Sequence, residues 1–456
     1  MSLAVPSAQQ AAIPFALEQP ELTIQSSAGS IVRRTVLENG VRILSEQIPA
    51  AMSATIGFWV PVGSRDEQPR TFGSTHFLEH LLFKGTTQSS AFDIAIAFDS
   101  VGGEHNALTA KEHTCYYAKV RDADVPMATR VIADMVIDSV LDAEEFEIER
   151  GVILEELAMA DDDPGDVAGE RLAELVYGAH PLGRPIGGTP ATIAAVGRDD
   201  VAKHYQEHYV PSNLVVTVAG AVDHDELVAL VRAALEARGW GQSVGAPNPR
   251  RSTTQQPISG GGTTVVQRPL EQINLMIGMP GLVATDPRRH EFAVLNSILG
   301  GGMSSRLFQE IRERRGLAYS VYTFGSAHSD AGMFGMYAGC SPKNAVNVAE
   351  LMVAELESVA RAGVTNDELA RAKGQLGGAS ALALEDSDSR MSRLGRAELT
   401  LGEFVDLETM LGRLDAVSAN AVQELAGQLL VAERSVAAVG TVEPNAFDGL
   451  SASSRS

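Results

Sequence analysis

The sequence has few cysteines and no long apolar run. Only two of its 456 residues, Cys115 and Cys340, are cysteines, too few for a disulfide framework or a cysteine zinc site. Both lie in apolar, strand-like stretches, so we expect reduced, buried thiols and a cytoplasmic protein. No segment reaches the ~18–20 uninterrupted apolar residues of a membrane span. The N-terminus also lacks the basic and apolar regions of a secretory signal.

Basic residues are scarce as well. There are 36 Lys and Arg against 58 Asp and Glu, which gives a formal net charge of −22. Such a surface repels nucleic acid and anionic membranes, so we expect neither as a partner. An enclosed acidic surface would favour basic, unfolded peptides, although solubility is the simpler explanation of the charge. The hydrophobic fraction of 45% is ordinary for a folded globular protein.

One breaker-rich stretch divides the chain. Residues 241–262 carry Pro247, Pro249, Pro257 and a glycine triplet, a density typical of an exposed linker. A chain of this length is also expected to form more than one domain. We therefore predict a flexible leader at 1–30, a domain at 31–240, a linker at 241–262, a second domain at 263–445 and a disordered tail at 446–456.

The two halves show the same order of elements. Alternating and helical patterns in the first half predict strands at 41–45 and 54–60, a helix at 76–83, a strand at 113–120, a helix at 125–141 and a helix start at 142–146. The second half repeats this order with strands at 263–267 and 272–279, a helix at 288–299, a strand at 332–339, a helix at 345–362 and a helix start at 365–369. Thr365 and Glu368 fit a capping box. Two successive copies of a helix-covered sheet predict an α+β protein of two similar domains.

The helix at 76–83 carries a metal-binding pattern. His76 and His80 lie four residues apart, so they share a helix face and can bind one ion. Glu79 projects along the same face, where a carboxylate can take a proton from a metal-bound water. Two unpaired histidines in so apolar a helix would be costly without a partner, and a cation removes that cost. The alternative is a structural helix with satisfied histidines.

A catalytic zinc site needs a third ligand and one open position. Candidates lie in the acidic helix at 147–157, where Glu149 and Glu156 share a face because they are two turns apart. Spacing alone does not choose among Glu149, Glu155 and Glu156, and a solvated face is the ordinary explanation for any one of them.

Together these residues resemble the pitrilysin-type inverted-zincin peptidases, family M16. The resemblance covers residues 32–442 and is greatest to compact bacterial members and to the catalytic subunit of mitochondrial processing peptidase. It implies a LuxS/MPP-like metallohydrolase fold and one zinc ion per chain. It also implies that His76, His80 and Glu156 are the ligands, that Glu79 is the general base and that Glu149 supports the ligands. Histidine and carboxylate ligands also accept cobalt or manganese.

Further motifs carry the same resemblance. Residues 102–107 resemble the family's active-site edge strand, which implies that Asn106 and Ala107 bind an extended substrate. Residues 312–319 resemble the segment whose arginine and tyrosine reach the substrate, here Arg312 and Tyr319. The glycine run at 300–302 is either a plain turn or a flexible substrate-contacting loop. His180 lies in a Gly/Pro loop, where a structural role is favoured over a ligand role.

The resemblance also implies an assembly and a substrate. Larger family members hold four such domains in one chain and this chain has two, so we expect a homodimer in which Arg312 and Tyr319 come from the partner. A chamber of this kind would admit short or unfolded polypeptides. Two alternatives remain: a scaffold protein that kept the fold without catalysis, and a zinc hydrolase of small molecules. The complete set of ligands and base argues against the first, and the edge strand against the second.

Overall fold

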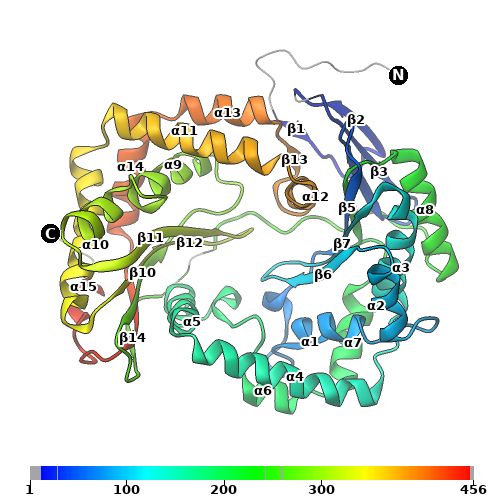
Figure 1. Ribbon diagram of the computed structural model, residues 1–456, viewed down its shortest axis with the longest axis horizontal. Coiled ribbons are helices and arrows are strands. Elements are labelled where there is room, and N and C mark those ends of the chain that lie inside the picture. The colour runs from blue at the N-terminus through cyan, green and yellow to red at the C-terminus, as the bar shows by residue number, and fades with distance from the viewer. Residues whose placement is uncertain (1–11, 28, 242, 257, 259, 452–456) are drawn as a thin grey trace. The chain divides into compact units, whose positions relative to one another are not determined.

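The computed structural model describes residues 12–451 except 28, 242, 257 and 259. The described chain forms two compact units, each with its own sheet and helices (Figure 1). Unit 1 contains the described residues of Met1–Leu157, Pro185–Arg251 and Ala381–Met410, and unit 2 those of Ala158–Arg184, Ser252–Ser380 and Leu411–Ser456. The predicted α+β class with two sheet-containing units is confirmed. None of the described helices is both long and apolar enough to cross a bilayer.

Unit 1 is built on a seven-stranded sheet. Its order is β2 (Glu21–Gln25), β3 (Ile31–Val36), β4 (Arg42–Gln47), β8 (Val215–Gly220), β5 (Ser53–Val60), β7 (Thr114–Arg121) and β6 (Glu104–Thr109). Only β4 and β8 pair in parallel. In the described chain β6 pairs with β7 alone, so it forms one edge of the sheet.

Different helices cover the two faces of this sheet. Successive residues of a strand point to opposite faces, so neighbouring residues of β5 meet different helices. Phe58 belongs to the core formed with α1 (Ser74–Leu82) and α3 (Val125–Asp138). The next residue, Trp59, faces the opposite core, where it packs with Met391 and Leu394 of α12 (Ser387–Arg396). Burial of apolar side chains on both faces accounts for the nearly continuous apolar sequence of β5.

Unit 2 repeats the part of this arrangement that runs from β4 to β6, with five strands and no counterparts of β2 and β3 among the described residues. The order is β11 (Ala318–Ala327), β12 (Gly332–Cys340), β10 (Ile273–Pro280), β14 (Ser435–Gly440) and β9 (Gly262–Gln267). Again only the β14–β9 pair is parallel. One face packs against α9 (Arg289–Gly300), α10 (Ala345–Ala362) and α14 (Ala419–Val431), and the other against α5 (Pro164–Tyr177). The capping box predicted before α11 (Asn366–Ala383) is present.

The units differ from the halves expected from the linker at 241–262. Helix α5 lies in the N-terminal half of the sequence but covers the sheet of unit 2. Helix α12 lies in the C-terminal half but covers the sheet of unit 1. Amphipathic periodicity shows that each helix has a buried face, but it does not say which sheet that face meets. Each half of the sequence therefore supplies one helix to the other half's sheet.

The chain ends also differ in part from expectation. The sequence predicts a flexible leader over 1–30, but β1 (Ile13–Pro14) pairs with β13 (Glu403–Phe404), and β2 adds to the sheet. Ile24 is the buried residue of β2, and its burial explains why the strand is ordered. At the other end, α15 (Asp448–Ser451) lies within the predicted tail. The remaining parts of both predictions, 1–11 and 452–456, lie outside the described residues.

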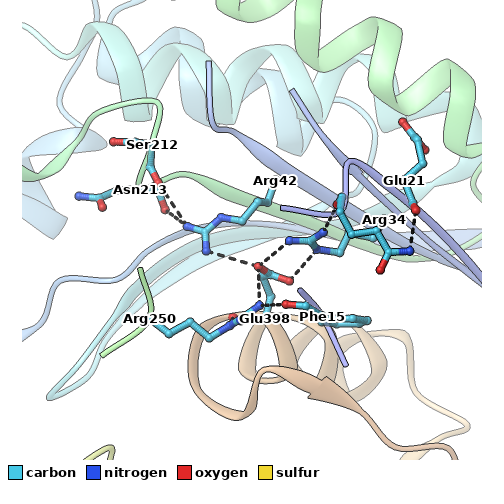
Figure 2. Close-up of polar contacts among 9 residues, drawn as sticks. Phe15, Glu21, Arg34, Arg42, Ser212, Asn213, Arg250 and Glu398 are labelled. Atoms are coloured by element: carbon cyan, nitrogen blue, oxygen red, sulfur yellow. Dashed lines mark hydrogen bonds and ion pairs between the residues drawn. The ribbon is translucent and has the colours of Figure 1, made fainter. Parts of the chain in front are cut away.

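Three arginines of unit 1 converge on one buried glutamate (Figure 2). Glu398, in the π-helix Ala397–Leu401 that follows α12, is fully buried. Its carboxylate lies 2.9 Å from Arg34 Nε, 3.4 Å from Arg42 Nη1 and 3.0 Å from Arg250 Nη2. Arg34 and Arg42 come from β3 and β4, so this cluster joins the 381–410 segment to the sheet that it covers.

Candidate metal centre

Helix α1 is mostly buried, but one of its faces is polar. Phe77, Leu78, Leu81 and Leu82 are all fully buried in the core of unit 1. His76, Glu79 and His80 remain partly exposed on the other face. The four-residue spacing places the two imidazole rings side by side, with centroids 4.8 Å apart.

Glu156 of α4 (Ala143–Asp162) completes a group of three potential ligands. Its Oε2 atom lies 3.4 Å from His80 Nε2 and 3.7 Å from His76 Nε2. In the described chain these three residues form the only group of three or more His, Cys, Asp or Glu side chains that could hold a metal ion, with all ligand atoms within 4.8 Å. Glu155 is exposed and lies outside the group.

The donors fit a zinc ion in spacing and in protonation. Atoms bound at about 2.0–2.2 Å to one tetrahedral ion lie roughly 3.3–3.6 Å apart, close to the separations found here. Burial lowers the pKa of His76 to about 4, so this imidazole is neutral at pH 7, as a ligand must be. Two imidazoles and one carboxylate are also the donor set of known catalytic zinc sites, which keep one position open.

A second carboxylate orients His80. Glu149 is 3% exposed, and its Oε2 lies 2.8 Å from His80 Nδ1, so Nε2 of that ring is directed toward Glu156. Lys84 Nζ lies 2.6 Å from Glu149 Oε1. Burial opposes the ionisation of Glu149, but the hydrogen bonds from Lys84 and His80 outweigh it and lower its pKa. An ionised Glu149 favours the tautomer of His80 that carries its proton on Nδ1.

Glu79 is held beside the cluster by a strand residue. The hydroxyl of Thr109, the last residue of β6, donates a hydrogen bond to Glu79 Oε2. Burial raises the pKa of Glu79, and the hydrogen bond from Thr109 opposes that effect. A carboxylate whose pKa lies above its usual value is better suited to accept and return a proton near neutral pH.

The edge strand expected to bind substrate is β6. Asn106 is exposed and Ala107 is partly buried on this strand, which carries Thr109 at its end. Asn106 Oδ1 accepts a hydrogen bond from the backbone N–H of Ala107 at 2.8 Å. The strand that meets Glu79 is therefore also the strand with an open edge in the described chain.

Arg312 and Tyr319 lie together in unit 2. The Arg312 guanidinium carbon is 4.6 Å from the centre of the Tyr319 ring, a cation–π geometry. Tyr319 is 75% exposed, so neither a core contact nor burial explains this tyrosine. Arg312 lies in the π-helix Phe308–Arg314, and Tyr319 lies at the start of β11, which begins after a connection of three residues.

Two other predicted features have structural partners. The glycine run at 300–302 is tied to α11, because Gln375 Nε2 donates to Gly301 O at 2.6 Å and Gln375 Oε1 accepts from Ser297 at 2.8 Å. His180 is not in the metal group, and its Nδ1 accepts from the backbone N–H of Leu182 at 3.3 Å. These contacts favour the structural interpretation of both features.

Three residues that contact this centre or its helix were not identified from the sequence. Thr109 and Lys84 contact Glu79 and Glu149, and Glu67 accepts hydrogen bonds from the first turn of α1. Lys84 follows the histidine motif closely, but a lysine after a helix is common and gives no signal. The roles of Thr109 and Glu67 depend on contacts between segments that are separate in the sequence.

Comparison with protein families agrees with this geometry. Residues 42–190 match the model of insulinase, peptidase family M16, and residues 195–376 match the model of the peptidase M16 inactive domain. The first match contains the metal group, and the second contains Arg312 and Tyr319. This division is consistent with the absence of a second metal group in the part of unit 2 that the structure describes.

Individual relatives extend over nearly the whole chain. An uncharacterized zinc protease of Streptomyces coelicolor is 47% identical over 90% of this chain and 90% of its own length. An uncharacterized zinc protease of Bacillus subtilis is 38% identical over 90% of this chain and 98% of its own. A protease from Helicobacter pylori shares the fold, with a TM-score of 0.80 and 22% identity over 90% of this chain and 99% of that one. The chain belongs to peptidase family M16.

Proposed function

We infer that this protein is a zinc metalloprotease, and we propose that it is an endopeptidase acting on short or unfolded polypeptides. The observation that carries the proposal is the group His76, His80 and Glu156, with Glu79 one residue from a ligand on the same helix. The buried Glu149 supports this proposal, because a histidine that binds a metal usually directs its other ring nitrogen to a carboxylate. We propose one zinc ion per chain, held by the three residues.

The proposed mechanism assigns each step to a residue of this chain. When bound, zinc supplies Lewis-acid chemistry that acidifies water and polarises a peptide carbonyl. Glu79 accepts the proton of the attacking water as the new C–O bond forms, and it returns that proton to the amine nitrogen as the C–N bond breaks. Thr109 holds the Glu79 carboxylate in place during both transfers.

The substrate is proposed to bind as an added strand. An extended peptide can pair with the open edge of β6, where backbone hydrogen bonds hold it without regard to sequence. Asn106 and Ala107 lie in the middle of this strand, and Thr109 at its end reaches Glu79. A folded protein seldom has a free extended segment that could pair with this edge, so we expect unfolded or short substrates.

A pocket within unit 2 supports a preference for basic substrates. The cavity has a volume of about 690 Å³. It is lined by Asp163, the residue before α5, and by Asp166 and Glu170 of that helix. Tyr322 and Tyr337 form another wall, with their rings stacked at 4.7 Å. Three carboxylates beside two aromatic rings suit an arginine or lysine side chain.

The proposed assembly is a homodimer that encloses a chamber. In it, Arg312 and Tyr319 of one protomer would stabilise the oxyanion formed at the metal site of its partner. The support for this proposal is the contact of the partly buried Arg312 with the exposed Tyr319, because both side chains carry hydrogen-bond donors. We further propose a cytoplasmic location, which is supported by two buried free cysteines.

The decisive experiment compares wild type with Glu79→Gln on an unstructured basic peptide. We expect wild type to cut the peptide, chelation to stop it and zinc to restore it. The Glu79→Gln variant should not cut but should still bind one zinc per chain. Metal binding without cleavage of any peptide in a broad mixture would support a scaffold role instead. Failure of wild type to bind zinc would refute the ligand assignment.

A further inference from the structure

The first turn of the metal-binding helix has no cap of its own. The residue before α1 is Gly73, which has no side chain to accept a hydrogen bond, and its φ of 94° lies in the left-handed region. The first backbone N–H groups of any helix need acceptors from elsewhere. In α1 those groups lie within one turn of His76, the first metal ligand.

Glu67 supplies the missing acceptors from a loop. Its Oε2 accepts from the N–H of Gly73 at 2.8 Å, and its Oε1 accepts from the N–H of Thr75 at 2.8 Å. The residue is only 4% exposed, so water cannot replace the carboxylate without rearrangement. We propose that Glu67 is a positioning residue, which caps α1 from outside the helix and thereby strengthens metal binding by His76 and His80.

The loop that carries Glu67 is itself fixed to the β6–β7 hairpin. The N–H groups of Ser64 and Arg65 donate to Ala110 O at 3.2 Å and to Lys111 O at 3.0 Å. The Arg65 guanidinium lies 2.6 Å from the carboxylate of Glu112. The loop therefore connects the first turn of α1 to the end of the strand proposed to bind substrate.

Contacts on other sides restrict movement of the same turn. The Thr75 hydroxyl lies 3.2 Å from His204 Nε2, and both residues are buried. A Cβ atom at Gly73 would meet Ile193 Cδ1 at 2.5 Å and Gly187 O at 2.8 Å, so the chain there is tightly enclosed. The Glu67 carboxylate thus acts on a turn that has little freedom to find other partners.

Charge gives the cap a second effect. A helix N-terminus carries roughly half a positive charge, which opposes a divalent cation bound one turn away. The carboxylate of Glu67 lies at that terminus and offsets its charge. Loss of the carboxylate is therefore expected to weaken zinc binding both through the charge and through the orientation of His76.

The proposal rests on the proposed zinc site, and the test separates the two. Zinc affinity of the full chain is measured by competition with a chromophoric chelator for wild type, Glu67→Gln, Glu67→Asp and a control, Glu226→Gln. Glu226 is an exposed carboxylate in the first turn of α8 (His224–Ala237), a helix without ligands. We expect Glu67→Gln to raise the zinc dissociation constant about ten-fold, Glu67→Asp to raise it less, and Glu226→Gln to change it less than two-fold.

A dissociation constant of Glu67→Gln within two-fold of wild type would overturn the proposal, and so would an equal loss in Glu226→Gln. A merely structural role would lower the melting temperature of the metal-free protein without changing zinc affinity at 25 °C. If Glu67→Gln does not fold, the test is the hydrogen-exchange rate of two backbone amides in Glu67→Asp. We expect the amides of Gly73 and Thr75 to exchange faster than in wild type, and unchanged exchange rates would refute the cap. If wild type binds no zinc, the proposed function fails instead.

Discussion

Thr109, at the end of the edge strand β6, donates a hydrogen bond to Glu79 on α1. The contact links the proposed substrate-binding strand to the proposed general base. A hydrogen bond to a charged group contributes about 1.5–3 kcal/mol. Thr109 is only 7% exposed, so its side of the contact is sheltered from water.

We expect Thr109→Val to lower kcat about ten-fold, because Glu79 loses the donor that orients it. Thr109→Ser keeps the hydroxyl and should retain most of the wild-type kcat. Zinc affinity and KM should change little in both variants. Steady-state kinetics on one fluorogenic peptide, with chelator competition, would check this. Equal kcat values for Thr109→Val and wild type would contradict the role.

The acidic pocket of unit 2 predicts a charge-dependent KM. Asp166→Asn combined with Glu170→Gln removes two of its carboxylates while keeping their size. We expect KM for a peptide with arginine to rise about ten-fold, and KM for the same peptide with citrulline to change less than two-fold. An equal effect on both peptides would show that the pocket does not select charge.

The proposed dimer predicts complementation between inactive chains. Glu79→Gln and Tyr319→Phe should each have low activity alone. When they are mixed and allowed to exchange, a site with native Glu79 can receive native Tyr319 from its partner. About a quarter of all sites should then recover, since half of the dimers are mixed and one of their two sites is complete. No recovery, despite exchange shown by labelled chains, would place Tyr319 in its own protomer's site or outside any site.

The arginine cluster around Glu398 predicts a large effect of one substitution on the stability of the protein. Glu398→Ala leaves Arg34 and Arg42 buried without their carboxylate (Figure 2), and removal of one member of such a cluster costs about 3–5 kcal/mol. Glu408→Ala, at an exposed position in the first turn of α13 (Leu407–Ala416), should cost less than about 0.5 kcal/mol. Urea unfolding measures both. A small loss in Glu398→Ala would mean that water reaches the arginines.

Buried His224 predicts a pH dependence of stability. Burial lowers its pKa to about 4, and both ring nitrogens contact hydroxyl groups, of Thr35 and Ser45. The unfolded chain takes up the proton near pH ~6.5, so the contribution is complete above that pH and is lost as the pH falls toward about 4. Between these values, unfolding of metal-free wild type should take up about one proton more than unfolding of His224→Gln. Equal pH slopes for the two proteins would contradict the assignment.

The local parts of this site could be predicted from the sequence. His76, Glu79 and His80 lie on one helix turn, and the helical period alone places them on one face. The placement of Glu156 needed the family resemblance, because its helix could present any of several glutamates. The contacts of Glu67 and Thr109 could not be predicted, since each joins segments whose approach is set by the packing of the whole unit.

The same distinction applies to the fold. Strands β5 and β10 and helices α3 and α10 follow from their hydrophobic periods, within a few residues of the predicted ranges. The exchange of α5 and α12 between the halves could not be read in this way. An amphipathic helix records how much of its surface is buried, but the sheet that it meets is determined by the course of the connections.

That exchange sets an order for folding during synthesis. Unit 1 ends its second segment at Arg251 but needs Ala381–Met410 to cover Trp59 and to neutralise Arg34 and Arg42. At typical translation rates the ribosome needs on the order of ten seconds to make the intervening chain. Throughout that interval the nascent sheet would expose an apolar face and uncompensated arginines. The sequence order therefore predicts that unit 1 cannot complete its packing until α12 has been made.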